Sequence, residues 1–350
     1  MSRSKLIVFN LETDLDSQVL ASAVSWIEEL SKSFEEVHVF STHVGRNNLP
    51  ENVTVSEIGG GSFLARLRAI PVLLKSAQLV QDKPSSWTVF HHMSSRTCFL
   101  LGLYFKIMRV RQILWYSHSH ASLDLILGYK FMDVIVTPTP TAFPLKSSKM
   151  RVTGHAIRPP SLNLDLESDN RSGIISLGRI AKVKNLTQLS SSLKNLEKNE
   201  LSRLRRVTLV GPIGEDEVYA KEVFTEFSKL QIEFDFTGAL SHENAREILN
   251  QNSLYFTGTP KSVDKATIEA AMAGCFVVSE TIEALELSGM IEVWRLCGYE
   301  TPPPLNIQIS TILSLNEEKA EVFRKMVSKS SIEMNRIETT IGKIVLSLIN

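Results

Sequence analysis

Short apolar runs alternate along the chain with longer stretches of helical period. The first half contains the runs LIVFNL, VHVFST, VTVSEI, TVFHHM, ILWYS, DVIVTPT and RVTGHAI, which are rich in β-branched and aromatic residues and are typical of buried strands. Residues 15–33, 62–81 and 95–109 show helical spacing between them. This alternation predicts a parallel sheet covered by helices, that is, one doubly wound α/β domain.

The same alternation starts again in the second half of the chain. Its strand-like runs are GIISLGRI, RVTLVG, IEFDFTG, SLYFTGTP and CFVVSE, separated by helical segments at 184–197, 215–229, 242–250 and 265–274. Between them and the first half, RPPSLNLDLESDNRSG has no periodicity and is rich in turn residues. We therefore expect two Rossmann-like domains, residues 1–158 and 173–332, joined by a linker at 159–172.

The chain reads as helix only after Pro304, and it ends in a long amphipathic segment at 333–349. No strand is left there for these helices to cover. They could cap the second domain, or the last helix could cross back onto the first. The pattern leaves both arrangements open.

Length and composition restrict the class of protein. A chain of 350 residues exceeds what one core usually organises, and 38 basic residues balance 38 acidic ones, so no overall charge attracts nucleic acid. Three scattered cysteines indicate neither a disulfide framework nor a zinc site and suit a reducing compartment. The longest apolar stretch, CFLLGLYF, is shorter than the roughly 20 residues that span a bilayer. We expect a cytoplasmic protein that meets a membrane, if at all, from its inner face.

The segment SLGRIAKVKN carries candidate chemistry at the end of a predicted strand. Gly178 ends the strand, and Arg179, Lys182 and Lys184 follow it. Ligands of open α/β sheets bind outside the carboxyl ends of the strands, and fixed cations there suit a diphosphate. The alternative is that both lysines are solvated and that Arg179 braces the loop through an ion pair.

Further along, glycines end two more strands and a small-residue helix follows. Gly211 and Gly238 stand where backbone can approach a ligand closely. In TPKSVDKATIEAAMAGCFVV, Asp264 is a candidate helix cap, and Glu269 lies one turn into the helix, where its carboxylate could accept hydrogen bonds from a ribose. The alternative for Glu269 is a surface acid stabilised by the helix dipole.

Together these segments resemble a known family. GRIAKVKN, FDFTGAL and IEAAMAGCFVV are similar, in order and spacing across residues 174–280, to elements of GT-B glycosyltransferases, with most similarity to family 4 of the retaining enzymes. The resemblance implies a GT-B fold, in which two Rossmann-like doubly wound domains face a cleft, with C-terminal helices. It also implies metal-independent sugar transfer from a nucleotide diphosphate-sugar to a glycan or lipid-linked acceptor, as in bacterial surface polysaccharide or lipopolysaccharide synthesis.

The resemblance also implies roles for individual residues. Arg179 and Lys184 match residues that stabilise the departing diphosphate, and His118, in LWYSHSHA, matches a histidine near the donor sugar. Glu269 would bind the ribose. The donor-binding residues expected in all are Glu269, Asp264, Gly211, Gly238, Ala239, Thr267 and Ser262. The nucleotide-sugar, with UDP or GDP as its nucleotide, is a co-substrate, and no cofactor or metal is expected.

Two departures from the family pattern leave alternatives open. Lys261 replaces the first residue of the usual Glu-x7-Glu pair, whose second residue is Glu269. Either Asp264 takes over the lost carboxylate contact, or the site has decayed and the chain is an inactive scaffold or regulatory subunit. A nucleotide-sugar epimerase is a third possibility, although no acid/base carboxylates for it are apparent. No G-x-G-x-x-G follows a strand, which argues against an NAD enzyme.

Several polar residues of the first domain also follow strands. Asp14 and Asp16, in the loop after the first strand, would meet acceptor hydroxyls. The other histidines at strand ends, which have no metal-ligand spacing, are expected to be buried polar residues that satisfy loop backbone. They are His91, His92, His120 and His155.

Residues 62–80 and 100–112 combine apolar faces with arginines and lysines. Such helices could lie on an anionic membrane, which would suit a lipid-linked acceptor. The alternative is that they are sheet-covering helices with solvated basic edges.

Overall fold

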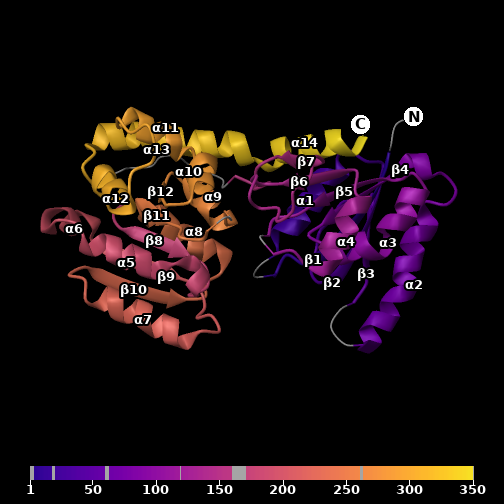
Figure 1. Cartoon of the computed structure of the whole chain (residues 1–350), viewed down its shortest axis with the longest axis horizontal. Helices are drawn as coiled ribbons and strands as arrows, with labels where there is room; N and C mark the ends of the chain where they lie inside the picture. Colours follow the sequence, from indigo (N-terminus) through magenta and orange to yellow (C-terminus); the bar gives the residue numbers. More distant parts are fainter. Residues whose placement is uncertain are drawn as a thin grey trace. The chain divides into compact units, whose positions relative to one another are not determined.

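The computed structural model describes residues 4–17, 20–59, 63–118, 120–159, 171–260 and 263–349, with backbone only at 63–68 and 242. The chain forms two compact units (Figure 1). The first unit combines residues 1–158 with residues 337–350, and the second spans residues 159–336.

The first unit is built on a parallel sheet of seven strands in the order β3-β2-β1-β4-β5-β6-β7. The strands are β1 (Lys5–Thr13), β2 (Glu36–Val44), β3 (Val53–Glu57), β4 (Trp87–His92), β5 (Arg111–Trp115), β6 (Val134–Thr137) and β7 (Met150–Val152). The order reverses beside β1, which is the arrangement of a doubly wound domain.

Helices cover both faces of this sheet. Leu6 and Val8 of β1 pack toward α1 (Ser22–Ser31) and α14 (Ile337–Ile349), whereas Ile7 and Phe9 pack toward α2 (Phe63–Leu79) and α3 (Ser95–Ile107). Burial of both faces explains why the strands of the sequence read as continuous apolar runs. The remaining short helices are α4 (Leu123–Gly128) and the 3-10 turns η1 (Pro84–Ser86) and η2 (Tyr129–Phe131).

The last helix belongs to the first unit. Ile341, Ile344 and Leu348 of α14 are buried in the core beneath β1, and the Ile337 N–H donates to the Ile157 carbonyl. The expected single helix at 333–349 is two helices, because Arg336 has extended backbone (φ −58°, ψ 135°) and separates α13 (Glu317–Asn335) from α14.

The second unit is built on a parallel sheet of five strands in the order β10-β9-β8-β11-β12. The strands are β8 (Ile174–Leu177), β9 (Arg206–Val210), β10 (Glu233–Gly238), β11 (Leu254–Phe256) and β12 (Phe276–Val278). The helices are α5 (Leu186–Lys194), α6 (Lys198–Leu204), α7 (Glu217–Ser228), α8 (His242–Gln251), α9 (Lys265–Met272), α10 (Ile282–Leu287), α11 (Met290–Leu296), α12 (Leu305–Leu313) and α13, with the 3-10 turn η4 (Lys182–Lys184) after β8.

The start of the first helix differs from the sequence expectation. The first helix begins at Ser22 rather than near residue 15, because the Asp16 N–H donates to Asp14 Oδ1 in a turn that follows β1. Within the ranges that the structure describes, no helix is both long and apolar enough to cross a membrane.

Candidate functional site

Lys184 and Asp264 meet at the carboxyl ends of β8 and β11. Lys184 ends the turn η4, and its ammonium forms an ion pair with Asp264 Oδ2, with the Lys184 side chain 18% exposed. The Thr259 hydroxyl donates to the same carboxylate oxygen at 3.2 Å. The pair is therefore partly shielded, so its charges are screened less than those of a surface pair.

Two glycines make room for Lys184. A Cβ on Gly178 would stand 2.9 Å from Lys184 Cε, and Gly178 also has a positive φ of +133°. A Cβ on Gly258 would stand 2.6 Å from the Lys184 carbonyl oxygen. A side chain at position 178 would displace the end of the Lys184 side chain, and one at position 258 would collide with its backbone, so both glycines help to place this residue.

The other two cations of the loop differ in their partners. Arg179 is exposed, and its guanidinium makes no ion pair or hydrogen bond with any residue that the structure describes. Lys182 Nζ lies 2.8 Å from Asp216, which caps α7 by accepting from the Tyr219 N–H. Lys182, with a side chain 74% exposed, thus fits the alternative of a solvated surface lysine, whereas Arg179 is available to an anion.

Helix α9 contributes two acidic residues. Asp264 occupies its N-cap position, but the expected capping bond is wrong, since the Asp264 side chain turns to Lys184 and Thr259. Glu269 lies one turn in and is partly exposed. Burial lowers the pKa of Lys265, one turn before Glu269, and the Glu269 charge opposes that shift, so the two side chains are electrostatically coupled.

Two residues of the expected donor site have structural contacts. Gly211 is buried, and a Cβ there would stand 2.1 Å from the Gly178 carbonyl oxygen, so this glycine allows two strand ends to approach each other. Thr267 is fully buried beside the Tyr255 hydroxyl, and its N–H donates to the Asp264 carbonyl.

The remaining donor-site residues have different surroundings. Gly238 has a φ of +70° with open space where a Cβ would point, and Ala239 is exposed, so both leave room for a ligand. Ser262 and Lys261 lie outside the described residues.

His118 lies in the first unit, in the loop after β5, and is exposed. Its ring Nδ1 accepts from the His120 backbone N–H at 3.0 Å, and the backbone N–H of His118 donates to the Ala142 carbonyl. A neutral imidazole whose Nδ1 accepts carries its proton on Nε2. The loop therefore presents an Nε2–H donor.

Two other histidines of this unit are structural. His91 is buried against the Phe9 ring, its Nδ1 lies 2.8 Å from the Thr97 hydroxyl, and burial lowers its pKa to about 3. His92 Nδ1 lies 3.2 Å from Asn10 Oδ1. Both are buried, as expected, but their partners are side chains of α3 and β1 and not loop backbone. His120, which was also expected to be buried, is exposed.

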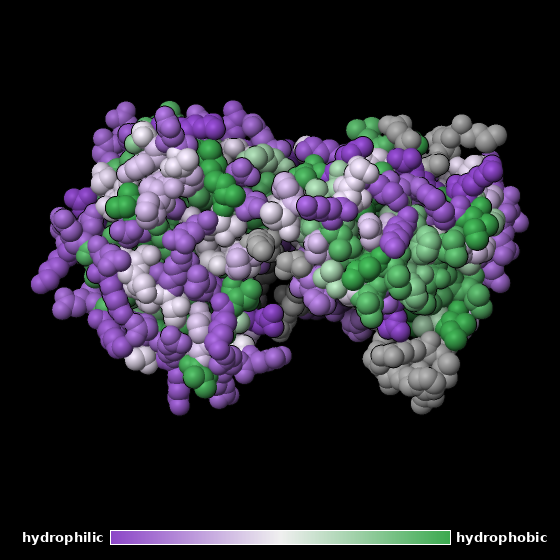
Figure 2. Space-filling view, in the orientation of Figure 1, coloured by the Kyte–Doolittle hydropathy of each residue, from purple (hydrophilic) through white to green (hydrophobic). Residues whose placement is uncertain are grey.

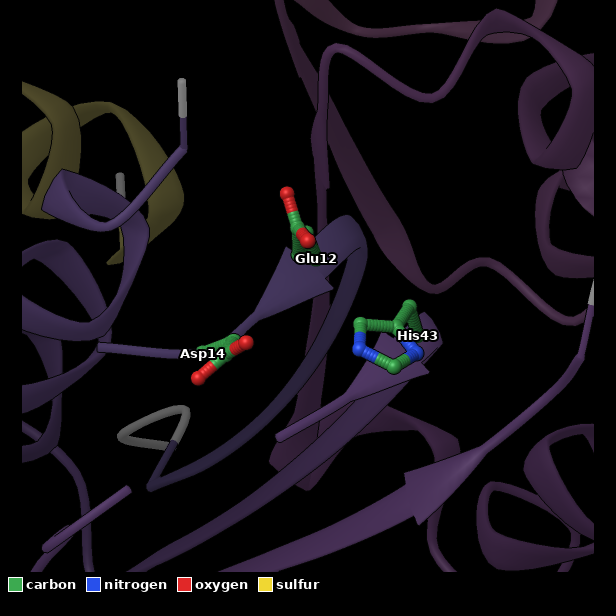
Figure 3. Close-up of side chains that lie close together, drawn as sticks. All are labelled: Glu12, Asp14 and His43. Atoms are coloured by element: carbon green, nitrogen blue, oxygen red, sulfur yellow. The ribbon is translucent and has the colours of Figure 1, made fainter. Parts of the chain in front are cut away.

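The carboxyl ends of β1 and β2 bring together Glu12, Asp14 and His43 (Figure 3). Their ligand atoms lie within 4.8 Å of one another, and Glu12 and His43 are direct neighbours in the parallel register. A Cβ on Gly45 would stand 2.2 Å from Asp14 Cγ, so that glycine admits the carboxylate. Two carboxylates and an imidazole could accept from sugar hydroxyls or hold a divalent cation.

Sequence reasoning found only part of this cluster. Asp14 was expected there, but Glu12 and His43 are brought together by strand register, which the sequence does not display. Asp16, also expected to meet an acceptor, pairs with Arg46 at 2.6 Å, and that hydrogen bond lowers the pKa of Asp16.

No protein-family model matches the chain, and no curated protein gives a significant match. Solved structures do match it over nearly its whole length. HepE from Anabaena, in complex with UDP and glucose, covers 99% of each chain at 14% identity with a TM-score of 0.67. A glycosyltransferase from Rickettsia africae ESF-5 matches at 12% identity over 98% of this chain and 97% of its own, with a TM-score of 0.68.

A third similar structure is the sucrose-phosphate synthase from Thermosynechococcus elongatus, at 14% identity over 98% of each chain with a TM-score of 0.66. At these identities the likeness concerns the fold. Together with the two parallel sheets, it assigns the chain to the GT-B fold.

Proposed function

We propose that this protein is a glycosyltransferase that moves a sugar from a nucleotide diphosphate-sugar to a glycan or lipid-linked acceptor. The observation that carries the proposal is the Lys184 ammonium, held over Gly178 at the end of β8 with the exposed Arg179 in the same loop. Two cations at a strand end suit a diphosphate. The UDP in the similar HepE structure supports UDP as the nucleotide.

The residues of the second unit have separate tasks. In the transfer, the acceptor hydroxyl oxygen forms a bond to the anomeric carbon, and the bond between that carbon and the diphosphate oxygen breaks. The diphosphate oxygen keeps the electron pair, and the acceptor proton passes to the released diphosphate or to solvent. Arg179 and Lys184 stabilise the negative charge that develops on this leaving group, which is the largest kind of contribution that fixed charges make to catalysis. Glu269 accepts hydrogen bonds from the ribose, and the open backbone at Gly238 and Ala239 borders the nucleotide.

The acceptor belongs to the first unit in this proposal. Asp14 and Glu12 accept hydrogen bonds from acceptor hydroxyls, and the Nε2–H of His118 donates to a sugar hydroxyl. The resemblance to family 4 supports retention of the anomeric configuration and a role in bacterial surface polysaccharide synthesis. Because Lys184 and Arg179 carry the charge of the leaving group, the reaction proceeds without a metal at the donor.

A thermal-shift panel of UDP-, GDP-, ADP- and dTDP-sugars tests donor binding. A donor at 100 times its dissociation constant should stabilise the protein by about 2.7 kcal/mol. Lys184→Ala and Glu269→Ala should each remove most of the shift. Lys182→Ala is the matched control, since Lys182 is 74% exposed and pairs with Asp216.

The panel also separates this proposal from its alternatives. If none of these nucleotide-sugars shifts the wild-type protein, the donor site is wrong. If one shifts it but no acceptor is glycosylated, the chain is a binding scaffold. Conversion of the bound sugar to its epimer, without an acceptor, would identify an epimerase.

A further inference from the structure

Large apolar side chains gather on the outer side of three helices of the first unit. We call this set the apolar face. Its members are Ile70 and Leu74 of α2, Phe99, Leu100, Leu103 and Ile107 of α3, and Leu123, Ile126 and Leu127 of α4. Figure 2 shows a broad hydrophobic area over these helices, and Ile107 and Leu123 are 71% and 77% exposed.

The apolar face is separate from the core. On α3, Cys98, Gly102 and Phe105 point inward and are buried, while Leu103 and Ile107 lie on the opposite side and are exposed. A helix that only covers a sheet is polar on its outer side, so an apolar outer side indicates a second partner.

Close packing joins the α3 and α4 parts of the apolar face. A Cβ on Gly128 of α4 would stand 2.7 Å from the Phe99 backbone nitrogen of α3, so the two helices are in direct contact. Monomeric soluble proteins rarely expose a contiguous apolar patch of more than a few hundred Å², and larger ones mark interaction sites.

The charge around the face is positive. Residues 63–109 contain seven lysines and arginines and one aspartate, although the whole chain is neutral. Arg96 lies on the same side of α3 as Leu100 and Leu103, and Lys75 follows Leu74 on α2; both are exposed. The acids near the face include Asp124 in α4 and Asp133, which pairs with Lys106 at 2.7 Å. Lys75 also lines a pocket that contains Glu35, Glu36 and Asp82.

We propose that the apolar face docks on an anionic lipid bilayer. The leucines and isoleucines of α2, α3 and α4 enter the boundary between headgroups and acyl chains, while Lys75 and Arg96 contact lipid phosphates. A second copy of the chain fits the face less well, because a symmetric dimer would bring the basic residues around the face against the same residues of the other copy. Docking does not depend on the proposed transferase activity.

Vesicle flotation of the full-length protein tests the proposal. Wild type should float with vesicles of phosphatidylcholine and phosphatidylglycerol, and it should float poorly with phosphatidylcholine alone. The pair Leu103→Asp and Ile107→Asp should reduce binding at least tenfold. Replacing Lys75 or Arg96 with Gln should reduce it about fivefold each, with the binding weakened further by salt.

The control pair is Val218→Asp and Val322→Asp, which places the same charges on exposed apolar residues of the second unit (78% and 58% exposed). It should bind vesicles as wild type does. All variants should keep the thermal shift with nucleotide-sugar, so a failure of docking and a failure of donor binding remain distinguishable.

Three results would overturn the proposal. Wild type that floats with neither vesicle does not dock on lipid. Equal binding to neutral and anionic vesicles removes the role of the cations. A dimer in light scattering that Ile107→Asp dissociates assigns the apolar face to a second copy.

Discussion

Lys184 and Asp264, 80 residues apart in the sequence, form an ion pair at the carboxyl edge of the second sheet. The Asp264 carboxylate therefore neutralises the charge of the lysine. A diphosphate that binds Lys184 has to replace Asp264 as its partner or tolerate that negative charge nearby. Asp264 thus controls how strongly the loop after β8 attracts an anion.

Asp264→Asn tests this control. Removing the competing carboxylate should tighten the binding of UDP alone by about tenfold, or about 1.4 kcal/mol, which is the scale of a partly screened charge interaction. Isothermal titration with UDP and with UDP-glucose measures it. If the variant binds UDP unchanged but loses affinity for UDP-glucose, Asp264 contacts the sugar and does not compete with phosphate.

Arg179→Gln should separate catalysis from stability. The guanidinium is exposed, so the variant should unfold within about 0.5 kcal/mol of wild type. Turnover should fall about 100-fold, because a fixed charge on the leaving group is lost. Denaturant unfolding and initial rates provide the two measurements, and unchanged turnover would remove Arg179 from the proposed mechanism.

Gly178→Ala should disturb Lys184 directly. The new Cβ would clash with Lys184 Cε at 2.9 Å, in addition to the strain of a positive φ. We expect weaker UDP binding and a loss of more than about 1 kcal/mol of stability. Gly298→Ala is the control, because Gly298 has no place in the proposed donor site and has a positive φ of +90° with open space at the Cβ position. Equal effects of the two variants would show that backbone strain alone is responsible.

Helix α14, which follows the second unit in the chain but belongs to the first, should stabilise the first unit. Ile344 is fully buried in its core, so Ile344→Ala should cost about 2–5 kcal/mol of unfolding free energy. Leu346→Ala, at a position 62% exposed on the same helix, should cost less than about 1 kcal/mol. Urea unfolding measures both, and a small loss for Ile344→Ala would mean that α14 contributes little to the core.

His91 should make the protein sensitive to acid. Burial holds its pKa at about 3, compared with 6.5 in the unfolded chain, so below pH 6.5 the unfolded state takes up a proton that the folded state does not. Stability should therefore fall between pH 6.5 and 3, by up to about 1.4 kcal/mol per pH unit from this group. His91→Gln should flatten that dependence, whereas His120→Gln, at an exposed position, should leave it unchanged.

Much of the fold could be predicted because the residue types of a strand indicate whether it is buried. The run around Leu6 to Phe9 is apolar at successive positions, and the structure buries both of its faces. The end of α13 was not predictable, since the apolar period continues across Arg336 while the backbone turns. The start of α1 was missed for a similar reason, because a local hydrogen bond to Asp14 replaced the expected helical turn.

The candidate site also contains some features that the sequence could predict and others that it could not. Arg179, Lys184 and Glu269 could be selected from residue type and spacing. The pairing of Lys184 with Asp264, the burial of Thr267 and the tight contact at Gly211 could not, because each depends on which strand ends become neighbours. Glu12 and His43 meet for the same reason, through the register of β1 and β2.

The sequence by itself determined two parallel α/β sheets and a cationic loop after β8, since periodicity and residue type act over a few neighbouring positions. Only the tertiary structure decided that α14 joins the first unit, that Asp264 neutralises Lys184, and that the outer sides of α2, α3 and α4 stay exposed. These features depend on packing between segments that are distant in the chain. An apolar pattern also looks the same in the sequence whether the helix face that carries it is buried or exposed.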